Sequence, residues 1–288
     1  MLQNVLVKGL LNLTPGIGNG TVTLKGVTVQ GKVLVSGGGA NSVIFEDCVF
    51  DDEVIIDRKD GRVRVAAQGS TKIRIIRVEA GSAKLEESSL AGDSDGFINV
   101  YITSGEEVEL EGDFEEVSVQ TPGSRLNLVS GTIKTINVED TAVSSTISLG
   151  ANTAVTTINI NTAASITGSG AIGTAVVNAE NVTIEQTPTK VELGDGISSV
   201  SVAGEEITEA TDTTQPAPEE TGAPSTGGGG GGVTRPNTYI LTLEAFPEAG
   251  GSVTDNTNTG PYTAGATVSV NAEANEGYQF INCGVTGW

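Results

Sequence analysis

The sequence predicts an all-β protein: a parallel β-solenoid (β-helix) of about nine coils, followed by a small, incomplete β-rich repeat module. Three observations predict this class. Residues 21–35 can be laid on residues 42–56, an offset of 21 residues, with the apolar positions matched. Apolar and polar residues alternate with a period of two, as in strands. Gly, Asn, Asp and Ser separate the short apolar stretches, as turns require.

The first coils are the clearest. The apolar residues of Thr21–Val35 meet those of Ser42–Ile56, and Cys48 takes the place of Val27. Cys48 is therefore interpreted as a small buried hydrophobe rather than a disulfide partner or a catalytic thiol. The preceding segment, Leu2–Gly20, is an imperfect first coil.

Two pairs of apolar positions continue through the later coils at steps of 19–23 residues. The first pair comprises Val22/Leu24, Val43/Phe45, Val63/Val65, Val108/Leu110, Leu126/Leu128, Ile147/Leu149 and Val182/Ile184. The second comprises Val33/Val35, Val54/Ile56, Ile73/Ile75, Ile98/Val100, Val117/Val119, Ile136/Val138, Ile158/Ile160 and Val200/Val202. When the coils stack, the side chains of both pairs point into the interior of the solenoid. An antiparallel sandwich or barrel also has short strands, but it gives no reason for this constant step.

The composition changes near residue 208, and the sequence predicts three parts. Residues 1–207 form the solenoid. Residues 208–237 form a flexible linker rich in Pro, Glu and Gly, with six consecutive glycines at 227–232. Residues 238–288 return to a strand-like pattern and form the small module, which at about fifty residues is near the lower limit for an independent core.

The last part resembles the divergent internalin-type B repeat of bacterial surface proteins. The resemblance is carried by Leu241–Leu243, Ala249–Val253, Tyr262–Val268 and Asn275–Phe280. The pattern departs at its end, where Ile281–Thr286 are inserted before Gly287-Trp288, so the module is expected to be truncated.

The first two hundred residues resemble solenoid segments of Gram-positive bacterial cell-surface proteins, which are often associated with S-layer homology modules. The resemblance is carried by Leu24–Val29, Gly31–Val35, Asp60–Val65 and Val182–Gln186. It implies extracellular display and a structural or adhesive role, and it transfers no catalytic residue. The predicted location is therefore the bacterial cell surface. No signal peptide is recognisable, so we expect the chain to be a piece of a longer protein.

Composition excludes several classes of function. The chain has 36 acidic and 15 basic residues and a net charge of −21, so nucleic acid and anionic lipid are not expected as partners. The absence of histidine excludes Ser–His and Cys–His nucleophile systems and His-ligated zinc. No apolar run approaches the roughly 18 residues of a membrane-spanning helix, so no membrane insertion is expected.

An enzyme remains the alternative, because β-helices include polysaccharide lyases and glycoside hydrolases. Asp93 and Asp95, in the insertion Ala91–Gly96, are candidates for an acid/base pair or calcium ligands, and Tyr101 is a candidate sugar platform. Aspartate beside glycine and serine is also ordinary turn chemistry, which is the preferred interpretation. These three residues are therefore binding candidates, with no catalytic, cofactor-binding or metal-binding residue assigned and no cofactor expected.

Two further expectations concern surface charge. The acidic run Glu106–Glu116 is interpreted as a solvated face. Four arginines on outward positions are expected to offset neighbouring acids: Arg62, Arg64, Arg74 and Arg77. Together these observations predict a non-enzymatic cell-surface scaffold, a rod that spaces or displays modules, with cell-wall, host or environmental glycan or protein as its partner.

Overall fold

The computed structural model describes residues 1–91, 94–212, 238–239, 243, 251–255, 262–263 and 269–275. The chain divides into two compact units, Met1–Glu219 and Glu220–Trp288. Each unit is described by itself.

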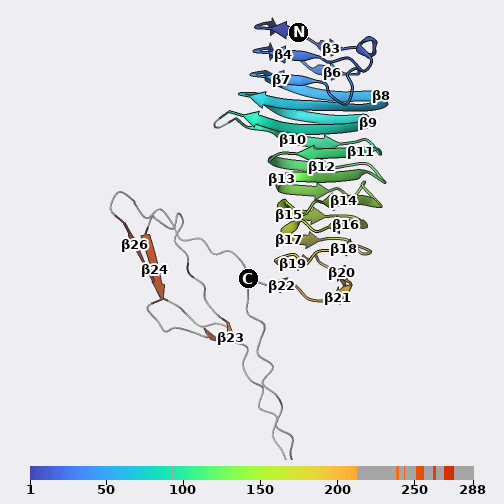
Figure 1. The fold of residues 1–288 in the computed structure, drawn as a ribbon. Helices are drawn as coiled ribbons and strands as arrows, with labels where there is room; N and C mark the ends of the chain where they lie inside the picture. Colours follow the sequence, from blue (N-terminus) through green and yellow to red (C-terminus); the bar gives the residue numbers. More distant parts are fainter. Residues whose placement is uncertain are drawn as a thin grey trace, which may run out of the picture. The chain divides into compact units, whose positions relative to one another are not determined.

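The first unit is a parallel β-solenoid of about nine turns (Figure 1), which confirms the predicted fold class. Each turn contributes to three ladders of parallel strand pairs, here called the first, second and third ladder. Strands of the first ladder alone are β1 (Leu2–Gln3), β4 (Thr23–Lys25), β7 (Ile44–Glu46), β11 (Glu107–Glu111), β14 (Ser145–Leu149), β16 (Ala164–Gly168), β18 (Thr183–Ile184) and β20 (Val200–Val202). The second ladder begins with β2 (Leu6–Val7) and β5 (Thr28–Val29), and the third contains β3 (Leu11–Leu13), β6 (Val33–Val35) and β19 (Lys190–Leu193).

The remaining solenoid strands bend and pass through more than one ladder. They are β8 (Val49–Gly69), β9 (Lys72–Leu90), β10 (Gly96–Ile102), β12 (Phe114–Val119), β13 (Arg125–Val138), β15 (Thr153–Ile160) and β17 (Ala171–Val177). A 3-10 turn, η1 (Pro15–Ile17), follows β3. The predicted insertion lies between β9 and β10, within the fifth turn.

Alternation along each strand places one side chain in two inside the solenoid, where it stacks on its counterpart in the next turn. Val108, Leu126, Ile147 and Ile166 form one such column in the first ladder, and all are at most 1% exposed. Each buried aliphatic side chain contributes about 1.5–3 kcal/mol against the entropy of ordering the chain. Since no single turn can bury its own apolar face, the turns stabilise one another.

The register of some predicted pairs is wrong. In the second set, Val33/Val35, Val54/Ile56, Val117/Val119, Ile136/Val138 and Ile158/Ile160 are true third-ladder pairs. Val54 lies beside Ile76 rather than Ile73, because Phe50 and Glu53 pair with Ile73 and Ile75. Strand β8 therefore has one residue more than β9 at this bend. In β9 the buried residues Ile73 and Ile76 are three positions apart, so the inward face changes from odd to even positions there.

The register also differs from the prediction at four other places. Val100 and Ile102, not Ile98 and Val100, continue the third ladder, while Val200/Val202 belong to the first. In the first ladder Phe45 pairs with Ala67, and Ile184 pairs with Ile166. Both first-ladder errors are shifts of two residues. Such a shift leaves the same residues pointing inward, so the apolar–polar alternation of the sequence does not show it.

The C-terminal end of the solenoid is covered by two antiparallel strands. Strand β21 (Glu205–Ile207) pairs with β20, and β22 (Thr211–Asp212) pairs with β19. They fold back on the last turn and occupy its backbone edge, which would otherwise be open to another strand. The predicted linker begins within this cap at residue 208, and its residues 213–237 lie outside the described part of the chain.

A buried arginine ties turns that are not adjacent. The side chain of Arg58 is 8% exposed and donates to the carbonyl oxygen of Gly18 at 2.9 Å and to Oδ1 of Asn19 at 2.8 Å. Its Nε has no hydrogen-bond partner within the described residues. The guanidinium therefore fixes the loop after η1 without a carboxylate to balance its charge.

In the second unit, two short antiparallel pairs are described. Strand β23 (Thr238–Tyr239) pairs with β25 (Tyr262–Thr263), and β24 (Gly251–Asp255) pairs with β26 (Val270–Ala274). Within the described residues of the whole chain, no helix is long and apolar enough to cross a membrane.

Candidate functional surface

The predicted candidates around the insertion have separate surroundings. Asp93 lies outside the described residues. The carboxylate of Asp95, just before β10, forms an ion pair with the ammonium group of Lys72 on β9, and the two side chains are 43% and 53% exposed. Exposed pairs of this kind contribute about 0–1 kcal/mol. Asp95 is therefore a surface ion-pair partner.

Tyr101 lies on the outward side of β10 and is held by a chain of charged side chains. The guanidinium carbon of Arg77 is 4.9 Å from the centre of its ring, within the range of a cation–π contact. Arg77 also donates to Glu53 at 2.7 Å, and Lys32 donates to the same carboxylate at 3.1 Å. Burial alone would raise the pKa of Glu53, but the hydrogen bonds and positive charges of Arg77 and Lys32 together lower it.

Tyr101 and Asp95 thus engage different basic side chains, Arg77 and Lys72. Among the described residues, no group of three or more His, Cys, Asp or Glu side chains is placed to hold a metal ion. Around Tyr101 the structure shows one aromatic ring, held by Arg77, beside polar side chains.

Those polar side chains form a column that the sequence analysis missed. On the outward side of the third ladder, Tyr101 is followed turn by turn by Ser118, Asn137 and Asn159. Ser118 is covered, with 3% exposure, whereas the other three side chains are partly exposed. The side-chain amide of Asn159 donates to Asn137 at 2.8 Å, and that of Asn137 donates to Glu116 at 2.8 Å. These hydrogen bonds fix the orientation of both side-chain amides. The repeated phrases TINV and TINI, at residues 135–138 and 157–160, were the available signal.

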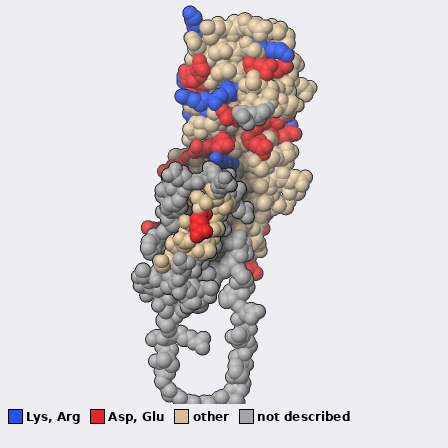
Figure 2. Space-filling model, turned by 90° about the vertical axis from the view of Figure 1, so that its left-hand side faces the viewer, with Lys and Arg blue, Asp and Glu red and all other residues tan. Residues whose placement is uncertain are grey.

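A second polar region lies on the outward side of the first ladder. Figure 2 shows basic and acidic side chains lying next to each other on one face of the chain. Lys84 forms ion pairs with Glu86 at 3.1 Å, with Glu109 at 3.5 Å and with Glu111. Arg64 donates to both oxygens of Glu86. The hydrogen bond from Arg64 is the largest cause that lowers the pKa of Glu86 to about 2. This set of paired charges is called the first-ladder ion network below.

The network confirms the expected role of the arginines in part. Arg62 pairs with Glu109 at 2.6 Å, and Arg64 and Arg77 also have acidic partners. Arg74 instead accepts, through its backbone carbonyl, a hydrogen bond from Asn99. The acidic run Glu106–Glu116 is therefore more than a solvated face, because several of its carboxylates are paired with bases of earlier turns.

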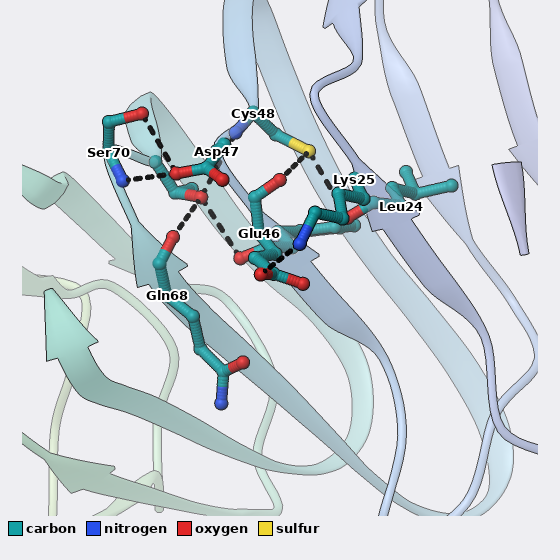
Figure 3. Close-up of polar contacts among 9 residues, drawn as sticks. Leu24, Lys25, Glu46, Asp47, Cys48, Gln68 and Ser70 are labelled. Carbon is teal, nitrogen blue, oxygen red and sulfur yellow. Dashed lines mark hydrogen bonds and ion pairs between the residues drawn. The ribbon is translucent and has the colours of Figure 1, made fainter. Parts of the chain in front are cut away.

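Other acids clamp one turn to the next at the corners. Figure 3 shows Asp47, whose Oδ1 accepts from the backbone N–H of Ser70 at 3.0 Å and from its hydroxyl at 3.1 Å. The backbone hydrogen bond is the largest cause that lowers the pKa of Asp47. The same arrangement recurs twice, between Asp113 and Thr132 and between Glu180 and Ser198. Each of these carboxylates joins two successive turns.

Cys48, beside Asp47, is confirmed as a buried hydrophobe. Its side chain is fully buried, and its thiol lies 3.3 Å from the carbonyl oxygen of Glu46 and 3.4 Å from that of Leu24 (Figure 3). Burial raises the pKa of the Cys48 thiol, so the reactive thiolate is disfavoured.

Comparison with known proteins adds two findings. Residues 241–285 match the family model of a divergent InlB B-repeat domain, which confirms the resemblance of the C-terminal module. The solenoid is similar to part of the structure of chitinase ChiW from Paenibacillus sp. str. FPU-7, a bacterial cell-surface-expressed multi-modular enzyme, at 29% identity and a TM-score of 0.49. That similarity covers 71% of this chain and 17% of the chitinase chain. Among curated proteins, no relative matches.

Proposed function

We propose that the chain is a non-enzymatic part of a bacterial cell-surface protein, in which the solenoid is a rod that spaces or displays other modules. The observation that carries this proposal is the continuity of the apolar columns from the first turn to the cap. About nine turns at the ~4.8 Å spacing of paired strands give a rod on the order of 40 Å long. The match of residues 241–285 to a B-repeat supports surface location.

Stiffness is the mechanical property that a spacer needs, and the side chains of the solenoid supply it in three ways. Apolar columns fill the interior. Carboxylate clamps such as Asp47–Ser70 join successive corners, and the first-ladder ion network joins turns one and two steps apart on the outside. Adhesion and association with an S-layer belong to the same proposal.

Binding of glycan or protein along the rod is the second part of the proposal. The partly exposed members of the column, Tyr101, Asn137 and Asn159, support it, since they offer an oriented aromatic ring and ordered amides. Amide and hydroxyl groups both donate and accept, which suits a neutral polyhydroxyl or a polar peptide surface. The net charge of −21 disfavours nucleic acid.

Two assays test the proposal. Purified chain is sedimented with insoluble cell-wall polysaccharide and peptidoglycan, with Tyr101→Ala as the test variant and Val129→Ala, an exposed position on β13, as the matched control. We expect binding that Tyr101→Ala weakens and Val129→Ala does not. The same mixtures are then assayed for new reducing ends and unsaturated sugars; sustained product formation would replace the scaffold by the lyase or hydrolase alternative.

A further inference from the structure

The carboxyl group of Glu87 occupies a position that the fold otherwise fills with apolar side chains. Leu24, Phe45 and Ala67 form an inward column of the first ladder, and Glu87 is next in register. An acid in such a position must be satisfied by hydrogen bonds, because it has lost much of its contact with water.

Backbone donors from two successive turns satisfy it. Oε1 of Glu87 accepts from the N–H of Phe97 at 2.7 Å, and Oε2 accepts from the N–H of Asp113 at 3.0 Å. Phe97 is at the start of β10, and Asp113 immediately precedes β12. One carboxyl group therefore joins two corners.

Glycine at both corners makes room for it. Gly96 has φ +55°, and a Cβ there would lie 2.0 Å from Oε1 of Glu87. Gly112 has φ +136°, and a Cβ there would lie 2.6 Å from the Cβ of Glu87. Any other residue would displace the carboxyl group, so the enclosure depends on glycine at both positions.

We propose that Glu87 is a proton-controlled clamp: its carboxyl group joins the corners Gly96–Phe97 and Gly112–Asp113, and protonation sets how tightly it holds them. Glu180 also accepts a backbone hydrogen bond, from Ser198, but its side chain is exposed, whereas that of Glu87 is partly buried.

The charges around Glu87 support this assignment. Burial raises the pKa of Glu87 to about 7 from its ordinary 4.5; the two backbone donors lower it, and the charge of Asp113 raises it further. The partner on β8, Ala67, and the first β10 side chain that faces inward, Phe97, are apolar. Three other acids on or beside the neighbouring strands are engaged elsewhere: Glu86 with Arg64 and Lys84, Glu111 with Lys84, and Asp95 with Lys72.

The direction of the effect follows from the raised pKa. Opening the corner returns the carboxyl group to water, where its pKa falls toward 4.5. Below about pH 4.5 both states are protonated, and the corner opens least readily, because burial favours the neutral carboxyl group. As the pH rises to about 7, opening releases a proton and becomes easier, by roughly two orders of magnitude in the opening constant. Above pH 7 both states are ionised, and the effect levels off.

Amide hydrogen exchange of the full chain tests the proposal. Protection factors of the Phe97 and Asp113 amides are measured by NMR from pH 4.5 to pH 8.5, after correction for the intrinsic pH dependence of exchange. We expect protection of both amides to fall roughly a hundredfold across this range and then level off. The Ser198 amide, held by Glu180, is the internal control and should stay constant, since the pKa of Glu180 is lowered.

Glu87→Gln separates the clamp from general effects of pH. Its neutral amide can accept from only one of the two N–H groups, so one corner amide should lose protection and the pH dependence of both should disappear. Glu180→Gln is the matched variant and should leave the Phe97 and Asp113 profiles unchanged. If the wild-type profiles of these two amides are flat, or if Glu87→Gln retains the pH dependence, the clamp is refuted. Should Glu87→Gln fail to fold, the wild-type profiles alone decide.

Discussion

Replacing Asn19 with aspartate is expected to stabilise the solenoid, because it gives a buried arginine a carboxylate. Nη2 of Arg58 donates to Oδ1 of Asn19 at 2.8 Å, and Nη1 donates to a backbone carbonyl. No ion pair among the described residues includes Arg58, whose side chain is 8% exposed. The geometry of a charge-assisted hydrogen bond is therefore already in place, and only the charge of the acceptor changes.

The size of the gain follows from the kind of hydrogen bond. A neutral hydrogen bond contributes about 0.5–1.5 kcal/mol and one to a charged group about 1.5–3 kcal/mol. Because Asn19 itself is exposed, solvent screens the new charge, and we expect about 1 kcal/mol. In a domain of this size that is a rise of roughly 2–4 °C in Tm.

Thermal unfolding of Asn19→Asp measures this gain at low and high salt. Asn12→Asp is the matched control: Asn12 is exposed on β3, and the substitution makes the same change in net charge. We expect stabilisation only for Asn19→Asp, smaller at high salt. A Tm for Asn19→Asp equal to or below that of Asn12→Asp would show that Arg58 needs no carboxylate, and the reasoning would be wrong.

Three further outcomes follow from the same packing. Ile136→Ala, at a fully buried inward position, should lower the free energy of unfolding by about 2–5 kcal/mol. Thr135→Ala, at the neighbouring outward position, should change it by about 0.5 kcal/mol or less. Equal effects of the two substitutions in urea titration would contradict the assigned alternation. Gly131→Ala would place a Cβ 1.9 Å from a backbone carbonyl oxygen of the previous turn, whereas the Cβ of Gly123→Ala, also at positive φ, has no neighbour within 4 Å. Only Gly131→Ala should prevent a native circular dichroism spectrum. Similar spectra for the two variants would argue against close stacking at Gly131. The lowered pKa of Glu86, about 2, adds stability above about pH 4.5 that is lost as the pH falls toward 2. In Glu86→Gln the free energy of unfolding should therefore depend less on pH between pH 4.5 and pH 2. An unchanged midpoint of acid unfolding would show that the ion pair does not stabilise the fold.

The fold class could be predicted from the sequence because each turn of a solenoid repeats the same pattern of apolar residues at a nearly constant spacing. Inward positions recur in every turn, and the two-residue alternation shows which side of each strand is apolar. Register was harder. Ile73, Ile75 and Ile76 are all apolar, so alternation alone did not indicate that the extra residue between Phe50 and Glu53 shifts the pairing.

The role of acidic residues was harder still. Aspartate in a turn suggested local hydrogen bonds, but Asp47 accepts from Ser70 in the following turn, and nothing in the sequence marks a contact at that separation. Glu87 gave no signal either, because an acid after an apolar alternation is ordinary for an exposed strand end. Its two glycine neighbours become informative only when the turns are stacked.

The distance between outward positions in different turns tests the continuous parallel ladder most directly. Asn12, Asn137 and Glu192 lie in one column of the third ladder, with Asn137 six and Glu192 nine turn steps from Asn12. At ~4.8 Å per step, spin labels at Asn12/Asn137 and Asn12/Glu192 should be separated by about 29 Å and about 43 Å. Genetically encoded labels leave Cys48 in place. Distances by pulsed electron paramagnetic resonance that grow in this proportion are the predicted result; equal distances, or a shorter one for Glu192, would contradict the solenoid.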